Sequence, residues 1–172
     1  RQALAFWGNE PAWPDRMARC RAHGIDPEAF EKRRGLDPCA HRPIYEWVRR
    51  HLDASAFLVH YPAALFAVRA ALRGRKRPRI VLVEHHSNAL KNARKWLMSA
   101  LALWLADGVV YLTPAYRDQV AARLGPWFRP RRTAVIPNGL DLERYRPPAS
   151  FSKPRPAPIL IGMSARMLPP KD

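Results

Sequence analysis

Residues 79–112 read RIVLVEHHSNALKNARKWLMSALALWLADGVVYL, and their pattern indicates the fold class. It opens with an apolar run rich in β-branched residues at 79–84 and continues with a helix-length segment at 88–106. A second apolar run follows at 108–112. Two short apolar strands separated by one helix are typical of parallel strands joined by a crossover. The stretch therefore predicts a β-α-β unit.

The same alternation continues on both sides of this unit. Further strand-length runs are found at residues 56–60 and 133–136. Helices are predicted at 62–73, closed by Gly74, and at 114–124, stopped by Gly125. Strands that are apolar almost throughout indicate a parallel sheet covered by helices on both faces. We predict an α/β fold with a doubly wound, Rossmann-like parallel sheet, which binds ligands beyond the carboxyl ends of its strands.

The first 52 residues are predicted to be helical. A helix over 14–23 ends at Gly24, a favourable residue just past a helix. Asp26-Pro27-Glu28 combines an N-cap, a proline in the first turn and an acidic residue, which predicts a second helix that stops near Gly35. Residues 43–52 place apolar side chains on one face of a third helix.

The other end of the chain indicates a domain boundary. Residues 147–158, PPASFSKPRPAP, are rich in proline and have no periodicity, which is typical of a linker. A new apolar strand begins at 159. We therefore expect a domain over 1–146, a linker over 147–158, and over 159–172 the start of a second domain that these 172 residues do not complete.

Composition limits the possible functions. The 30 Lys and Arg outnumber 14 Asp and Glu, giving a formal charge of +16, while 48% of the residues are hydrophobic. The chain can thus bury a core, and its charge suits anionic lipid, a phosphorylated substrate or nucleic acid. No apolar run reaches the roughly 18 residues of a membrane span. Cys20 and Cys39 form no metal or redox motif, so we expect two free thiols in a reducing, cytoplasmic compartment.

Polar residues follow two of the predicted strands. His85 and His86 come directly after the strand at 79–84. Histidine suits proton transfer or charge stabilisation near neutral pH, although a loop histidine can equally cap the next helix. The adjacent pair has no metal-site spacing, and no metal is expected. Thr113 follows the strand at 108–112 and is predicted to cap the next helix, whose N-terminus could also face a ligand.

Two further segments carry candidate residues. Asn138-Gly139 follows the last strand of the first domain and predicts a tight turn with positive φ, with Asp141 two residues on. Arg166 and Lys171 stand five residues apart behind a strand and a turn of small residues. Such an arrangement suits a diphosphate, because small residues let the backbone approach and two cations neutralise the charge.

The order of these segments resembles glycosyltransferase family 4, the retaining sugar transferases with the two-domain GT-B fold. The matching segments are Ile136-Pro137-Asn138-Gly139-Leu140-Asp141, then Ala165-Arg166-Met167-Leu168-Pro169-Pro170-Lys171-Asp172. In the second, Ala165 and Asp172 replace glycines of the family motif. Glu84-His85 and residues 106–113 also look like the family. The resemblance covers residues 56–172 and leaves out 1–52.

The resemblance implies roles for the candidates. Arg166 and Lys171 would bind the leaving diphosphate of a nucleotide-diphosphate sugar, the donor substrate, without metal or other cofactor. His85, or else His86, would lie beside the donor sugar as the catalytic histidine. Thr113, Asn138, Gly139 and Asp141 would shape the cleft and hinge. The family's E-x7-E pair is absent, so we expect these 172 residues alone to be inactive.

The acceptor would be a glycan or a lipid-linked sugar. The helix at 88–106 carries Lys91, Arg94 and Lys95 ahead of a broad apolar face, which suits either burial on the sheet or contact with an anionic membrane surface. Two alternatives to the transferase remain open. One is a basic α/β module for nucleic acid, which is disfavoured because no recognition motif is present. The other is a different GT-B enzyme, such as a sugar-nucleotide epimerase.

Overall fold

The computed structural model describes residues 2–8, 13–31, 41–73, 78–85, 88–139 and 142–143. The chain divides into two compact units, residues 1–138 and 139–172, and nearly all the described residues belong to the first unit. The predicted linker at 147–158 and the predicted strand after it lie outside the described residues. The domain boundary proposed there stays a prediction.

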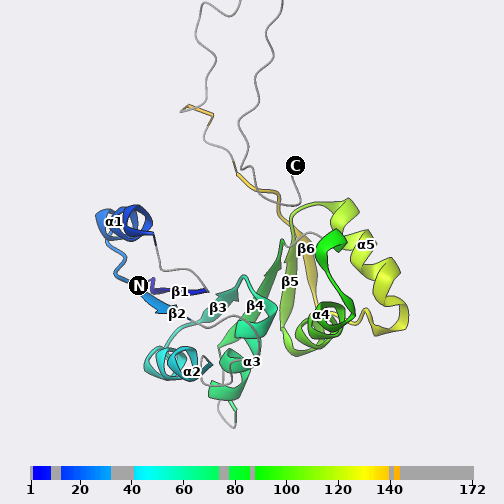
Figure 1. The fold of residues 1–172 in the computed structure, drawn as a ribbon, viewed down its shortest axis with the longest axis horizontal. Helices are drawn as coiled ribbons and strands as arrows, with labels where there is room; N and C mark the ends of the chain where they lie inside the picture. Colours follow the sequence, from blue (N-terminus) through cyan, green and yellow to red (C-terminus); the bar gives the residue numbers. More distant parts are fainter. Residues whose placement is uncertain are drawn as a thin grey trace, which may run out of the picture. The chain divides into compact units, whose positions relative to one another are not determined.

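A four-stranded parallel sheet forms the centre of the first unit (Figure 1). Its strands lie side by side in chain order: β3 (Ala56–Val59), β4 (Arg79–Glu84), β5 (Gly108–Tyr111) and β6 (Thr133–Val135). The connections are made by α3 (Pro62–Ala71), α4 (Ala93–Leu105) and α5 (Pro114–Leu124), the last followed by the short helix η3 (Gly125–Trp127). The expected α/β, Rossmann-like fold class is confirmed.

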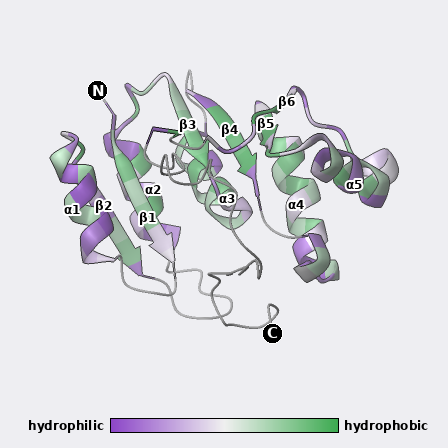
Figure 2. Ribbon diagram, turned by 90° about the horizontal axis from the view of Figure 1, so that it is seen from above, coloured by the Kyte–Doolittle hydropathy of each residue, from purple (hydrophilic) through white to green (hydrophobic). Residues whose placement is uncertain are grey.

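The two faces of this sheet differ in burial. Ile80 and Leu82 of β4 are fully buried, whereas Leu58 of β3, which points to the other face, is 67% exposed. Figure 2 shows α3, α4 and α5 on the same side of the sheet. Each strand lies next to the preceding one, so right-handed crossovers bring successive helices to the same face. Among the described residues, α3, α4 and α5 thus cover one face of this sheet, and the prediction of helices on both faces is not confirmed.

The N-terminal segment contains a second, two-stranded parallel sheet. Strand β1 (Leu4–Gly8) pairs with β2 (Pro27–Glu31), and α1 (Pro14–Ala22) connects them. The predicted helix α1 is confirmed, and Gly24 behind it has a φ of +73°. The prediction of helix over 1–52 is wrong at β1, and the helix predicted to start at Pro27 is wrong because these residues form a strand. Pairing with β1 outweighs the local start signal, and proline is tolerated at the first residue of a strand.

The third predicted N-terminal helix is confirmed as α2 (His41–Arg50). Its buried residues, Ile44, Trp47 and Val48, belong to the main hydrophobic core. Trp47 packs edge-on against Phe57 of β3, with ring centroids 6.1 Å apart. The helix thereby joins the N-terminal segment to the main sheet.

The helix predicted over 88–106 is divided into two parts. A 3-10 turn, η2 (Asn88–Leu90), comes first, and α4 begins at Ala93. The division occurs at Asn92, whose side-chain oxygen accepts a hydrogen bond from the amide of Lys95 at 3.0 Å. Asparagine is a strong N-cap because its oxygen satisfies an amide at the helix start. The local cap therefore starts α4 five residues later than the apolar pattern indicates.

Asp107 belongs to the segment 106–113, which resembles the transferase family, and its contacts give it a structural role. Its carboxylate oxygen Oδ2 accepts a hydrogen bond from the amide of Ile80 at 2.9 Å, and its own amide donates to the Ile80 carbonyl at 2.8 Å. These contacts join β4 to the residue that enters β5. The aspartate is structural, and it lies at the sheet edge opposite the carboxyl ends.

Candidate active site at the carboxyl edge

Two histidines meet where β3 and β4 end. His60 follows β3 and His85 follows β4, and their ring centroids lie 5.5 Å apart with an interplanar angle of 56°. Because side chains alternate along a strand, the residue after Glu84 belongs to the less covered face. Sequence analysis identified His85 but not His60. The position of His60 immediately after a parallel strand was a signal that could have found it.

Burial and charge affect the protonation of this pair. The pKa of His60 lies below its ordinary value, first because of partial burial and second because of the nearby His85. Two imidazolium groups at this separation would repel each other, so His60 favours its neutral form. A neutral ring can donate one hydrogen bond and accept another. The pair can thus supply both a proton donor and an acceptor at one point on the sheet edge.

Aromatic side chains lie next to this pair along the chain. Tyr61 follows His60, and its ring centroid is 5.7 Å from that of Trp7 in β1. The ring of Trp7 also lies 5.1 Å from His41 at the start of α2. Trp7 thus contacts rings both from the segment after β3 and from the start of α2. The contact of Trp7 with Tyr61 joins residues 54 apart in sequence, and its contact with His41 joins residues 34 apart.

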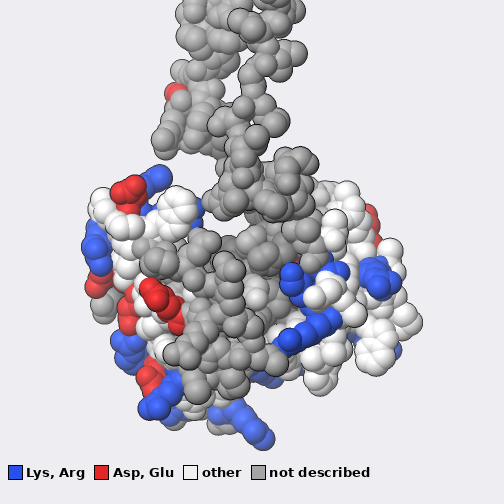
Figure 3. Space-filling model, viewed as in Figure 1, with Lys and Arg blue, Asp and Glu red and all other residues white. Residues whose placement is uncertain are grey.

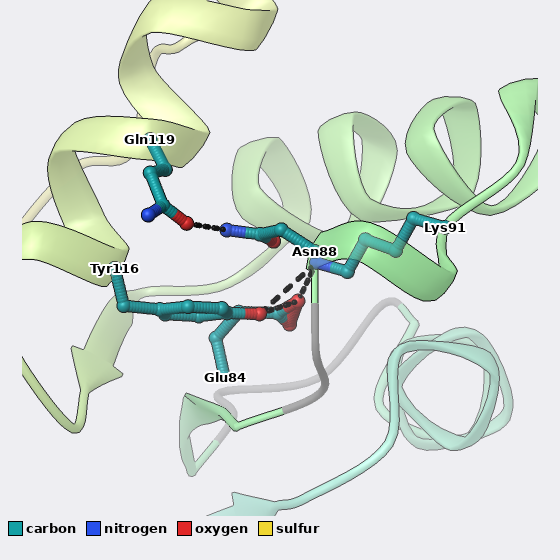
Figure 4. A network of polar contacts seen from close by, with 5 residues as sticks. All are labelled: Glu84, Asn88, Lys91, Tyr116 and Gln119. Carbon is teal, nitrogen blue, oxygen red and sulfur yellow. Dashed lines mark hydrogen bonds and ion pairs between the residues drawn. The ribbon is translucent and has the colours of Figure 1, made fainter. Parts of the chain in front are cut away.

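A buried polar cluster lies under the helices, directly beside His85 in sequence. Glu84 is 1% exposed and the side chain of Lys91 is 5% exposed; Lys91 Nζ donates to Glu84 Oε1 (Figure 4). Tyr116 of α5 donates from its hydroxyl to the same oxygen at 3.3 Å. Lys91 also contacts the Tyr116 hydroxyl at 3.3 Å. The cluster ties together the end of β4, the segment before α4 and the first turn of α5.

Further contacts extend this cluster. Asn88 Nδ2 donates to Gln119 Oε1 at 3.1 Å, which links η2 to α5. The Tyr111 hydroxyl and Glu84 Oε2 are buried without a hydrogen-bond partner among the described residues. Burial raises the pKa of both Tyr111 and Tyr116, and the Glu84 charge raises them further. Both phenols therefore stay protonated and neutral across the physiological range.

Thr113 caps α5, as predicted. Its hydroxyl oxygen accepts a hydrogen bond from the amide of Tyr116 at 3.1 Å. The cap fixes the first turn of α5 and with it the backbone of Tyr116, whose hydroxyl belongs to the buried cluster. The described contacts therefore support a helix-capping role for Thr113.

Other sequence candidates are placed differently or fall outside the description. Asn138 and Gly139 are exposed, and neither has a positive φ, so the prediction of a positive-φ turn is wrong. The amide of Ile136 donates to the Tyr111 carbonyl at 2.9 Å, which continues the extended path of β6 towards Pro137. Four candidates lie outside the described residues: His86, Asp141, Arg166 and Lys171.

Several negative findings apply to the described part of the chain. No group of three or more potential metal-ligating side chains comes together there. A shallow groove between β2 and α2, lined by residues such as Phe30 and Tyr45, shares no residue with the histidine pair or the buried cluster. Cys20 is a free, half-buried thiol, and Cys39 is not among the described residues.

The outer face of α4 is unusually apolar. Leu97, Leu101 and Trp104 are 62%, 41% and 63% exposed, and their spacing places them in one stripe. Arg94 and Lys95 are exposed at the start of the same helix. The expectation that Lys91 belongs to this surface is wrong, because it is buried against Glu84. None of the described helices combines the length and apolar character needed to cross a membrane.

These features define a Rossmann-like domain with a histidine pair at the carboxyl edge of its sheet. Residues 4–144 match the family described as Glycosyltransferase Family 4, and the chain belongs to that family. The match begins at residue 4, so it includes most of the segment 1–52 that the resemblance seen in the sequence left out. A search of curated proteins finds no match to this chain. Family membership favours a glycosyltransferase-like enzyme over a nucleic-acid-binding module.

Proposed function

We propose that this chain supplies the acceptor-side domain of a retaining glycosyltransferase whose donor is a nucleotide-diphosphate sugar. One observation carries the proposal: His85 lies at the carboxyl end of β4, in ring contact with His60. Family membership supports donor and acceptor binding in general. In parallel α/β sheets this edge is where ligands bind.

The proposed roles follow from the chemistry of each side chain. His85 would lie beside the donor sugar, where an imidazole can stabilise charge as the glycosidic bond breaks. His60 would accept a hydrogen bond from His85 or donate one to it. His86 is the alternative to His85 as the residue beside the donor sugar. Arg166 and Lys171 would neutralise the departing diphosphate, since residues 159–172 resemble the start of a nucleotide-sugar-binding domain. No metal or other cofactor enters this proposal.

Substitution of the adjacent histidines tests the assignment. In the protein as its gene encodes it, His85→Asn should lower kcat by about 100-fold, the usual effect of removing one charge-stabilising group. His86→Asn is the matched control and should change kcat little. The measurement is release of nucleoside diphosphate from the donor. Full activity of His85→Asn together with loss in His86→Asn would move the role to His86, and full activity of both would reject a histidine role.

We further propose that the protein works at the cytoplasmic face of a membrane, on a glycan or lipid-linked acceptor. The apolar stripe on α4, defined by Leu97, Leu101 and Trp104, would enter the interface, and Arg94 would meet anionic head groups. Figure 3 shows Lys and Arg both over the part of the surface where Figure 1 places α4 and α5 and near α1 and α2, whereas most acidic groups in this view lie near α1, β2 and α2.

Sedimentation with vesicles of phosphatidylglycerol and phosphatidylcholine tests the membrane proposal. We expect binding at low salt that weakens as salt rises, because counterions screen the head-group attraction. Trp104→Ser should reduce binding several-fold, whereas Trp13→Ser, which changes an exposed tryptophan outside the stripe, should not. Absence of binding at low salt would reject the proposal.

A further inference from the structure

The buried ion pair between Glu84 and Lys91 spans the position of His85. Glu84 is the last residue of β4, and Lys91 lies between η2 and α4. The contact therefore ties the backbone just before His85 to the backbone just before α4. Tyr116 adds a third attachment from α5, through its hydroxyl at 3.3 Å from Glu84 Oε1 (Figure 4).

Strand alternation gives Glu84 and His85 opposite directions. Glu84 pairs in register with Tyr111, and both side chains belong to the face under the helices. The next side chain, that of His85, belongs to the other face and meets His60. Anchoring the Glu84 carboxylate on one side of the sheet thus restrains the backbone from which the His85 ring projects on the other side.

The energetic cost of the cluster indicates a purpose other than stability. Removing a carboxylate and an ammonium from water costs several kcal/mol for each ion, and a buried pair is often no more stabilising than apolar side chains of similar size. The cluster also leaves Glu84 Oε2 without a hydrogen-bond partner among the described residues. A basic side chain at the surface, where Arg94 and Lys95 lie, avoids this cost. Unlike an apolar contact, the ion pair holds the Glu84 carboxylate in one orientation.

We propose that Glu84, Lys91 and Tyr116 are positioning residues that hold His85 at the carboxyl edge of the sheet. The importance of this role for catalysis rests on the proposed function of His85. The restraint itself is a property of the chain and can be measured without substrate. None of the three side chains needs to touch the donor or the acceptor.

Hydrogen exchange and NMR of the His85 amide and ring test the restraint in the 172-residue chain. The variants are Glu84→Gln, Lys91→Met and the double variant with both changes. Each single variant leaves a buried charge unpaired and should lower the midpoint of unfolding. The double variant removes both charges and should recover part of that loss. In all three, the His85 amide should exchange at least about tenfold faster than in the unchanged chain.

The double variant separates positioning from general stability. If the His85 amide of the double variant exchanges at the original rate once the midpoint of unfolding has recovered, the proposal is overturned. Val120→Ala is the matched control, because it removes buried methyl groups from α5 and changes none of the polar side chains of the cluster. Compared at equal global stability, it should leave His85 exchange unchanged. Should the charge variants not fold, Tyr116→Phe decides: unchanged exchange at His85 would also overturn the proposal.

A kinetic measurement connects the restraint to the reaction. In the protein as its gene encodes it, Tyr116→Phe should lower kcat several-fold with little change in KM, because the substrate contacts are intact. If His85→Asn proves fully active while the exchange results hold, the proposed catalytic role fails and the restraint stands. If exchange does not change, the restraint fails whatever the kinetics of His85→Asn.

Discussion

His85 shows how a shift of one position along the chain changes the surroundings of a side chain. Glu84 and His85 are neighbours in sequence, yet one is buried in an ion pair and the other lies at the sheet edge beside His60. The sequence suggested His85 because polar residues after a buried strand are common at active sites. It could not suggest Lys91 as the partner of Glu84, because that contact requires η2 and the start of α4 to turn back over the strand.

The first prediction concerns His60 and pH. Its pKa in the folded chain lies below the ordinary 6.5, so the unfolded chain takes up a proton at higher pH than the folded chain does. The free energy of unfolding should therefore fall as the pH drops from about 6.5 through the folded pKa. Urea unfolding between neutral and mildly acidic pH measures this loss.

His60→Gln removes the group and should flatten that part of the pH profile. NMR titration separates the two causes: in His85→Asn the pKa of His60 should rise, since the second cause is removed, while burial still holds it below the ordinary value. If His60→Gln and the unchanged chain have the same pH profile of stability, His60 is not the group that causes the loss at mildly acidic pH.

Element boundaries here depend on single residues at the ends. Asn92 starts α4, Thr113 starts α5, and Gly125 ends α5 with a φ of +50°. These caps act locally, so the sequence predicted the start and end of α5 correctly. The strand β2 is the opposite case. Its Asp-Pro-Glu start signal is typical of a helix, and only the neighbouring strand β1 makes it extended.

The second prediction tests the end of α5. Gly125→Ala should lower the free energy of unfolding by about 1–3 kcal/mol, because an L-residue is strained at positive φ. Nothing lies within 4 Å of the added methyl group, so the cost comes from the backbone alone. Gly108→Ala is the matched control, since it also has open space but no positive φ, and it should cost little. Equal losses measured by urea unfolding would contradict this.

At the scale of the whole molecule, the described core of the first unit has one dominant layer. Residues from α2, α3, α4, α5 and three strands pack together on the helix side of the main sheet. The other face carries more exposed apolar residues, including Leu58 and Ile136. Stability should therefore depend on which face a side chain points to, even between neighbouring strands of the same sheet.

The third prediction compares the two faces. Leu82→Ala, on the buried face of β4, should lower the free energy of unfolding by about 2–5 kcal/mol, because it leaves a cavity in the core. Leu58→Ala on β3 removes the same methyl groups from an exposed position and should cost less than about 1 kcal/mol. Urea unfolding of both variants checks this, and similar losses would mean that the second face is as well packed as the first.

Local sequence patterns were enough to predict the parallel α/β fold, the bounds of β4 and α5, the family resemblance and the position of His85. Apolar runs, caps and turn residues are local signals, and a local signal can be recognised without knowing what packs against it. Tertiary structure alone decided that residues 27–31 are a strand, that His60 meets His85, and that Lys91 is buried on Glu84. Each of these depends on a partner distant in sequence or on a backbone reversal, which no local pattern of residues encodes.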